Sequence, residues 1–197
     1  MSQGKGKPDE ERGALEGPQR LHRKPIYPGQ VVNLSVDTVR LPNGVDVELE
    51  MVRHPGAAAM VPVDSQGRVL LVRQYRYATD GFLLEIPAGK LDAGEPPERC
   101  AHRELIEEIG QRAGRLSPLG WIWTTPGFSD EKIWLYLALD LQEAEQALEE
   151  DEVLTVERLS LEEAVARAQR GEIVDAKTVC GLLRAWARLE KDPGGGS

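Results

Sequence analysis

The segment Gly89–Gln111 limits the possible folds more than any other part of this 197-residue chain. Two prolines precede an unbroken run of helix-forming residues that stops at Gly110, and proline before with glycine after is typical of a single helix. Within it, three carboxylates follow the spacing i, i+3, i+4, which places them on one helical face: Glu104, Glu107 and Glu108. Three adjacent carboxylates repel one another unless a cation joins them. The pattern therefore predicts a helix that binds a hard divalent cation such as Mg²⁺.

The remaining pattern predicts an α/β fold. Alternating apolar and polar residues on both sides of Asn43-Gly44 indicate a hairpin of strands 31–40 and 45–52. The turn Asp64-Ser65-Gln66-Gly67 indicates a second hairpin, of strands 57–63 and 69–75. Further elements follow the helix: strands 121–124, 133–139 and 153–159, and helices 161–169 and 176–190. Because strands and helices do not alternate strictly, we expect a mixed sheet with helices packed on it.

The domain organisation is expected to be simple. Residues 1–24 are polar and rich in Gly and Pro, so we expect a disordered N-terminal segment. Residues 25–56 hold the N-terminal strands and 57–191 the main domain, and 192–197 form a flexible tail.

Composition excludes several classes of protein. With 24 basic and 33 acidic residues the formal net charge is −9, which argues against a nucleic-acid backbone as partner. No apolar run approaches the ~18 residues of a membrane span, and the N-terminus lacks the apolar stretch of a secretory signal. The two cysteines, Cys100 and Cys180, lack metal-ligand spacing, so we expect reduced thiols and a cytoplasmic protein.

The segment Gly89–Gln111 resembles the Nudix box, G-x5-E-x7-R-E-U-x-E-E-x-G-U with U a bulky aliphatic residue. Eight positions are in register: Gly89, Glu95, Arg103, Glu104, Leu105, Glu107, Glu108 and Gly110. Gln111 departs from the pattern, which weakens a packing contact but touches no ligand. The resemblance implies metal ligands at Glu104 and Glu108, at Glu107 directly or through water, and at the carbonyl of Ala88. It implies a structural role for Gly89, Glu95, Arg103 and Gly110, and Mg²⁺ as cofactor with Mn²⁺ as a possible substitute.

Three further segments resemble the ADP-ribose pyrophosphatase group of that family. Pro126 follows Gln111 by 15 residues, as in this group, and Ser129-Asp130-Glu131 follows Pro126. Val72-Arg73-Gln74-Tyr75-Arg76 and Leu84–Gly89 match its V-R-Q-x-R and L-E-x-P-A-G segments. By this resemblance Arg76 binds a substrate phosphate, and Glu85 and Glu131 line the nucleotide or terminal ribose.

The acidic run Glu149-Glu150-Asp151-Glu152 resembles the late loop from which the group draws a general base and a further metal ligand. We match Glu150 to the base and Glu152 to the ligand, with a shift of one or two positions left open. Glu107 is the alternative base. Members of the group commonly exchange front-end strands in a homodimer, so Val31 and Glu50 are expected to line the partner's pocket.

The resemblance implies a Nudix α/β/α sandwich with a mixed sheet, preceded by an N-terminal β-hairpin extension. It implies Mg²⁺-dependent hydrolysis of ADP-ribose to AMP and ribose 5-phosphate, without a nucleic-acid or membrane partner. Two alternatives stay open. The substrate could be another nucleotide sugar, such as GDP-mannose or UDP-glucose, or the chain could be a non-catalytic ADP-ribose sensor. The intact set of box carboxylates favours an enzyme.

Overall fold

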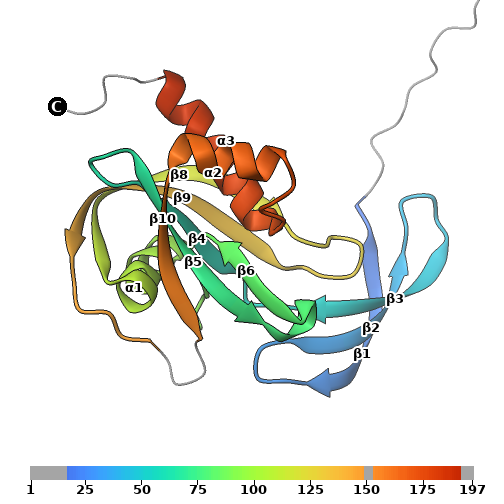
Figure 1. Cartoon of the computed structure of the whole chain (residues 1–197). Coiled ribbons are helices and arrows are strands. Elements are labelled where there is room, and N and C mark those ends of the chain that lie inside the picture. The colour runs from blue at the N-terminus through green and yellow to red at the C-terminus, as the bar shows by residue number, and fades with distance from the viewer. Residues whose placement is uncertain (1–16, 149–152, 192–197) are drawn as a thin grey trace, which may run out of the picture. The chain divides into compact units, whose positions relative to one another are not determined.

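The computed structural model describes residues 17–148 and 153–191 (Figure 1). The chain divides into two compact units, Met1–Arg53 and His54–Ser197. The candidate site described below lies within the second unit.

The first unit is a three-stranded antiparallel sheet in the order β1-β2-β3, with strands Gln19–Pro28, Asn33–Arg40 and Asp46–Arg53. The hairpin predicted around Asn43-Gly44 is confirmed as β2–β3. Its turn depends on Gly44, which has a φ of +83°, and on the Asn43 side chain, which accepts a hydrogen bond from the Val45 N–H. Strand β1 differs from expectation, because it begins within the segment predicted to be disordered.

A charged cluster, rather than an apolar core, is the most buried part of this sheet. Asp37 is 2% exposed, and its carboxylate accepts hydrogen bonds from Arg23, Arg53 and the Ser35 hydroxyl. Burial opposes ionisation of Asp37, but these hydrogen bonds and the two arginine charges together lower its pKa to about 2. Asp37 therefore stays ionised at neutral pH.

The second unit contains two sheets and three helices. The strands are β4 Ala57–Pro62, β5 Arg68–Arg76, β6 Gly81–Glu85, β7 Ala88–Lys90, β8 Gln111–Trp123, β9 Lys132–Glu143 and β10 Leu154–Ser160. The helices are α1 Pro97–Ile109, α2 Leu161–Gln169 and α3 Ala176–Lys191, with a 3-10 turn at Tyr77–Thr79. One sheet has the order β10-β5-β6 and the other β7-β4-β9-β8. The pair β4–β9 is parallel and the others are antiparallel, so the mixed character predicted from the sequence is confirmed.

The predicted second hairpin is wrong, although its turn forms. Asp64 accepts the Gly67 N–H through its carbonyl and the Gln66 and Arg68 N–H groups through its carboxylate. Only one bridge, Val63 to Val69, joins the two sides before β4 and β5 enter different sheets. Strand β4 is buried along its whole length and pairs with β7 and β9 instead. Partners distant in sequence thus override the local turn signal.

Helices cover both sides of these sheets (Figure 1). Because side chains alternate along a strand, Ala58 and Met60 of β4 pack with helix α1, whereas Ala59 and Val61 pack with α2 and α3. Two apolar clusters result, one on each side of β4. The arrangement is the α/β/α sandwich expected from the sequence.

Candidate active site

Helix α1 carries the acidic motif and is fixed at both ends. Pro96 precedes its first residue, and Gly110 ends it with a φ of +61° while its N–H bonds the Ile106 carbonyl at 3.0 Å. The apolar residues Ala101, Leu105 and Ile109 anchor the helix to the sheet. The same side buries two of the three carboxylates, because Glu104 and Glu108 are 7% and 1% exposed.

The strand β7 brings backbone against these two carboxylates. The Ala88 N–H donates to Glu108 Oε2 at 2.9 Å. A Cβ added at Gly89 would lie 1.8 Å from Glu104 Oε1, so only glycine leaves room for that carboxylate. Ala88 and Gly89 therefore lie directly beside the acidic face of α1.

Arg103 organises the exposed side of the same cluster. Its Nη1 donates to Glu104 at 2.5 Å and to Glu107 at 2.8 Å, and its Nη2 donates to Glu95 at 3.0 Å and to the Lys90 carbonyl at 3.1 Å. The hydrogen bond with Glu95, followed by the charge of Glu104, raises the Arg103 pKa above its ordinary value. Arg103 thus ties helix α1 to the loop that precedes it.

The donor set fits a divalent cation, although the carboxylates do not converge as they stand. Within residues 17–148 and 153–191, no group of three acidic, histidine or cysteine side chains is arranged to hold a metal. In this structure Arg103 donates hydrogen bonds to both Glu104 and Glu107. Carboxylates on one helical face, next to a close backbone segment, supply the oxygen ligands that hard cations prefer. A bound cation would compete with Arg103 for Glu104 and Glu107.

A pocket of about 510 Å³ opens next to this cluster. Its walls come from the ends of β5 and β6, from β7, from the start of α3 and from the loop between β8 and β9. The lining residues are His54, Ala57, Arg76, Ala78, Thr79, Leu83, Glu85, Ala88, Gly89, Lys90, Thr124, Thr125, Glu131, Ile133, Asp175, Ala176 and Lys177. The structure therefore brings Arg76, Glu85, Ala88, Gly89 and Glu131 together around one cavity.

Part of the pocket lining is a chain of charges, in which Glu85 and Lys177 are buried. Arg76 donates through Nε to Glu85 Oε1 at 2.9 Å and through Nη2 to Oε2 at 2.8 Å. Lys177 Nζ donates to the same Oε2 and to Asp175 Oδ2, the latter at 3.1 Å. Glu85 is 1% exposed, and burial would raise its pKa, but the Arg76 hydrogen bonds and the Lys177 charge lower it below its ordinary value. Glu85 is therefore an ionised group enclosed by two cations.

The pocket lining also contains a polar group that sequence reasoning missed. His54 Nδ1 accepts the Gly56 N–H at 3.1 Å, which leaves Nε2 as the donor of the neutral ring. Glu131 lies 3.5 Å from His54 Nδ1 and accepts the Thr124 hydroxyl at 2.7 Å. His54 has no motif spacing in the sequence, and it reaches the pocket because Pro55 and Gly56 lead directly into β4. Lys177 was missed for a similar reason.

Pro126 is not among the residues that line this pocket. Pro126 begins the turn in which Phe128 and Ser129 N–H groups bond the Thr125 carbonyl. Val31 and Glu50 belong to the first unit, and their role in a partner's pocket stays a prediction. Glu150 and Glu152 lie outside the described residues.

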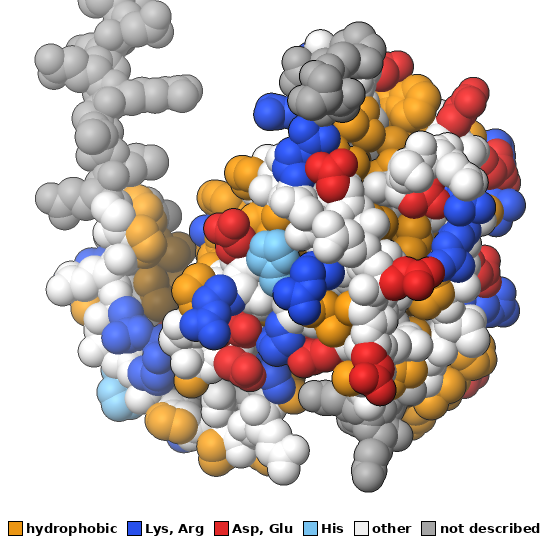
Figure 2. All heavy atoms as spheres, turned by 90° about the vertical axis from the view of Figure 1, so that its left-hand side faces the viewer, with side chains coloured by type: hydrophobic (Ala, Val, Ile, Leu, Met, Phe, Trp, Pro, Cys, Tyr) orange, Lys and Arg blue, Asp and Glu red, His pale blue; other side chains and the backbone are white. Residues whose placement is uncertain are grey.

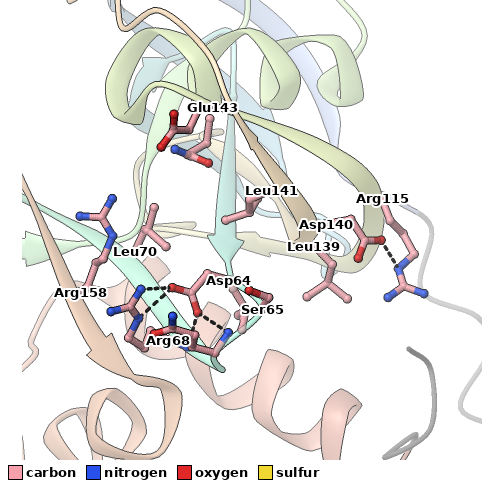
Figure 3. Close-up of a pocket in the computed structure, with 13 residues that line it drawn as sticks. Asp64, Ser65, Arg68, Leu70, Arg115, Leu139, Asp140, Leu141, Glu143 and Arg158 are labelled. Carbon is pink, nitrogen blue, oxygen red and sulfur yellow. Dashed lines mark hydrogen bonds and ion pairs between the residues drawn. The ribbon is translucent and has the colours of Figure 1, made fainter. Parts of the chain in front are cut away.

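A second pocket, of about 360 Å³, lies where β5 begins, whereas Arg76 lies where β5 ends (Figure 3). Arginines and carboxylates both line it, and Arg68 pairs with Asp64 while Arg115 pairs with Asp140. Of the acidic motif only Gln111 lines this pocket. The polar surroundings explain how a glutamine is tolerated where the motif usually has an aliphatic residue.

The surface of the protein mixes charges of both signs. Basic and acidic side chains lie next to one another on the face shown in Figure 2, without a large patch of one sign. In the described part of the chain, each helix is too short or too polar to cross a membrane.

The fold and the site together are those of a class of hydrolase in which a helix presents buried carboxylates to a close backbone segment beside a pocket. The NUDIX domain profile matches residues 52–181. The chain therefore belongs to the Nudix family, and dependence on a divalent cation follows from that membership.

Individual relatives cover most of the chain. It is 41% identical over 164 residues to an ADP-ribose pyrophosphatase of Bacillus subtilis, and the aligned region covers 82% of this chain and 89% of that relative. It is 41% identical over 172 residues to a methanol dehydrogenase activator of Bacillus methanolicus, covering 86% and 93%. An ADP compounds hydrolase of known crystal structure superposes with a TM-score of 0.79 over 91% of this chain and 98% of that one, at 24% identity. This last similarity supports the fold.

Proposed function

We propose that this protein hydrolyses the diphosphate of ADP-ribose, with Mg²⁺ as cofactor, to give AMP and ribose 5-phosphate. The observation that carries the proposal is the placement of buried Glu104 and Glu108 against Ala88 and Gly89, beside a pocket lined by Arg76. The similarity to the Bacillus subtilis ADP-ribose pyrophosphatase supports the choice of substrate.

Glu104, Glu108 and the Ala88 carbonyl would hold the cation, with Glu107 as a further ligand. When bound, the cation would offset the charge of the diphosphate and make a water molecule more acidic. Mn²⁺ offers the same oxygen-binding chemistry and is the expected substitute. Arg103 also bonds Glu95 and the Lys90 carbonyl, so it would keep these partners if a cation took its place at Glu104 and Glu107.

Arg76 would hold the phosphate group that must not move during the reaction. Its Nε and Nη2 are engaged with Glu85, so Nη1 is the part of the fork left to face an anion. Glu131, which lines the same pocket, would contact the nucleotide or terminal ribose. Glu85 would contribute to substrate binding by fixing Arg76, since its own oxygens already accept three hydrogen bonds.

A carboxylate must take the proton from the attacking water as oxygen adds to phosphorus and the bridging P–O bond breaks. We assign this role to Glu150 and a further metal-binding role to Glu152, from the resemblance of the acidic run 149–152 to the family's late loop. Glu150→Gln should lower kcat strongly with little effect on KM, and Glu152→Gln should also weaken the dependence on Mg²⁺. If Gln substitutions at all four acidic positions leave kcat intact, Glu107 becomes the better candidate for the base.

The protein is further proposed to act in the cytoplasm as a homodimer. The two cysteines are unpaired thiols, as expected of a reducing compartment. Exchange of the first unit between protomers would bring Val31 and Glu50 to the partner's pocket. Light scattering of the intact protein tests the homodimer, and the kinetics of Glu50→Ala test whether Glu50 reaches the partner's pocket. A monomer with full activity would contradict both the homodimer and the exchange.

A substrate panel decides between the candidate activities. ADP-ribose, GDP-mannose and UDP-glucose are incubated with the protein in Mg²⁺ or in excess chelator, and the released phosphomonoester is measured. We expect ADP-ribose to give the highest kcat/KM and the chelator to abolish turnover. Higher kcat/KM for another sugar would reassign the substrate, and binding of ADP-ribose without turnover would indicate a sensor.

A further inference from the structure

Lys177 belongs to none of the sequence motifs, yet it lies in the wall of the candidate site. It is 9% exposed, although it carries a charge, and buried lysines require partners. Its two partners are Glu85, which is 92 residues away in sequence, and Asp175. All three residues line the same pocket as Arg76.

The start of helix α3 holds Lys177 firmly in this position. Asp175 caps the helix, because its Oδ2 accepts the Thr178 N–H at 2.9 Å and the Thr178 hydroxyl at 2.6 Å. The Thr178 oxygen in turn accepts the Ile86 N–H at 2.8 Å, and Thr178 is wholly buried. Ile86 directly follows Glu85 in sequence. The start of α3 is therefore joined to the end of β6 by the Lys177–Glu85 pair and, next to it, by the Thr178–Ile86 hydrogen bond.

This geometry gives Glu85 a second cation. Without Lys177, the charge of the buried Glu85 would be balanced by Arg76 alone among the described residues. In that case an anion that draws the Arg76 guanidinium toward it through Nη1 would weaken the single cation contact of the buried carboxylate, which is costly. With Lys177 present, Glu85 keeps a cation while the Arg76 guanidinium, 40% exposed at the pocket, engages an anion.

We propose that Lys177 is a positioning residue, which acts through Glu85 to keep Arg76 available to the diphosphate of the substrate. The inference rests on the proposed function, because it assigns Arg76 to the substrate phosphate. Lys177 itself need not contact the substrate. Its effect is therefore expected to appear in substrate binding and to depend on Arg76.

The test is a double-mutant cycle of Lys177→Met and Arg76→Ala in the full-length protein, with KM and kcat measured on ADP-ribose. Lys177→Met should raise KM by roughly 10-fold or more, as expected when a charge-assisted hydrogen bond is compromised, with kcat within about threefold. In the Arg76→Ala background, the same substitution should change KM by less than about twofold, because residues that act as one unit are not additive. A purely structural role would not depend on Arg76 in this way.

The controls separate the inference from folding and from the proposed function. Lys191→Met, at the exposed end of the same helix, should leave KM and kcat unchanged. Lys177→Gln keeps a donor but no charge, and it serves as the second variant if Lys177→Met does not give a folded protein by thermal melting. An unchanged KM in the folded variant, or an equally large effect in both backgrounds, would overturn the inference. If the wild type does not hydrolyse ADP-ribose, the proposed function fails, and the cycle is measured on the nucleotide sugar that it does hydrolyse.

Discussion

Gly89→Ala should disable the site through one added methyl group. The new Cβ would lie 1.8 Å from Glu104 Oε1, whereas real Cβ contacts are not shorter than 3.0 Å, so the carboxylate or the loop must move by at least the difference of 1.2 Å. A misplacement of about 1 Å in a reacting group costs on the order of 100-fold in rate, or about 2.7 kcal/mol of transition-state stabilisation. We therefore expect kcat to fall about 100-fold and the affinity for Mn²⁺, measured by calorimetry, to weaken.

This variant should stay folded, because the expected loss of stability is small beside the roughly 5–15 kcal/mol that stabilises a typical domain. Moving the Glu104 carboxylate disturbs its hydrogen bond with Arg103, which is worth about 1–3 kcal/mol, and leaves the apolar contacts of α1 in place. Gly81→Ala is the matched control, because its Cβ would have no neighbour closer than 3.9 Å. If Gly89→Ala retains kcat within threefold and binds Mn²⁺ normally, Glu104 is not a metal ligand and the reasoning is refuted.

Three further predictions follow from buried groups. Glu108→Gln should leave the protein folded, because Gln can still accept the Ala88 N–H. The same substitution should lower kcat by several orders of magnitude at saturating Mg²⁺. A kcat within tenfold of the wild-type value would show that Glu108 is not a metal ligand. The pKa of Asp37 is lowered to about 2, from 3.8 for an unperturbed carboxyl group. This shift stabilises the folded state by about 2 kcal/mol above pH 4, and the contribution is lost as the pH falls toward 2. An NMR titration of the Asp37 carboxyl carbon with a midpoint near pH 4 would contradict this. Burial raises the pKa of Cys100 to about 12, so at pH 8 a thiol reagent should label Cys180 and spare Cys100, as peptide mapping would show.

The sequence predicts most accurately those features that are local. The bounds of α2 and α3 agree with expectation to within one residue, and α1 ends before Gly110 as expected, because caps and spacing are local to each helix. The β2–β3 hairpin follows from a two-residue turn signal. The acidic face of α1 follows from the i, i+3, i+4 spacing alone.

Features that depend on distant partners could not be predicted in this way. The turn Asp64–Gly67 forms as expected, but the partners of β4 are β7 and β9, which the local pattern does not encode. Strand β8 was expected only at its last residues, because it contains Gly114, Pro118 and Gly120 and most of its residues are not buried. A register shift between Pro118 and Gly120 lets the strand continue through them.

The same distinction separates the two kinds of residue in the candidate site. The box carboxylates lie on one helix, so their arrangement is visible as a spacing. Lys177 acquires its environment only when the start of α3 meets the end of β6, and His54 only when the β8–β9 loop brings Glu131 beside it. Such residues can be found only once the fold is known.

The charged wall of the pocket has a cost that stability alone does not justify. Removing charges from water is expensive, and buried ion pairs are often no more stabilising than apolar side chains of similar size. Arg76, Glu85, Lys177 and Asp175 nevertheless form a continuous chain of pairs, and each of them lines the pocket. Apolar side chains would bury this wall as well, but they would offer no cation to a diphosphate. The chain of pairs is therefore best explained by the need to hold one guanidinium at the pocket without exposing the carboxylate that orients it.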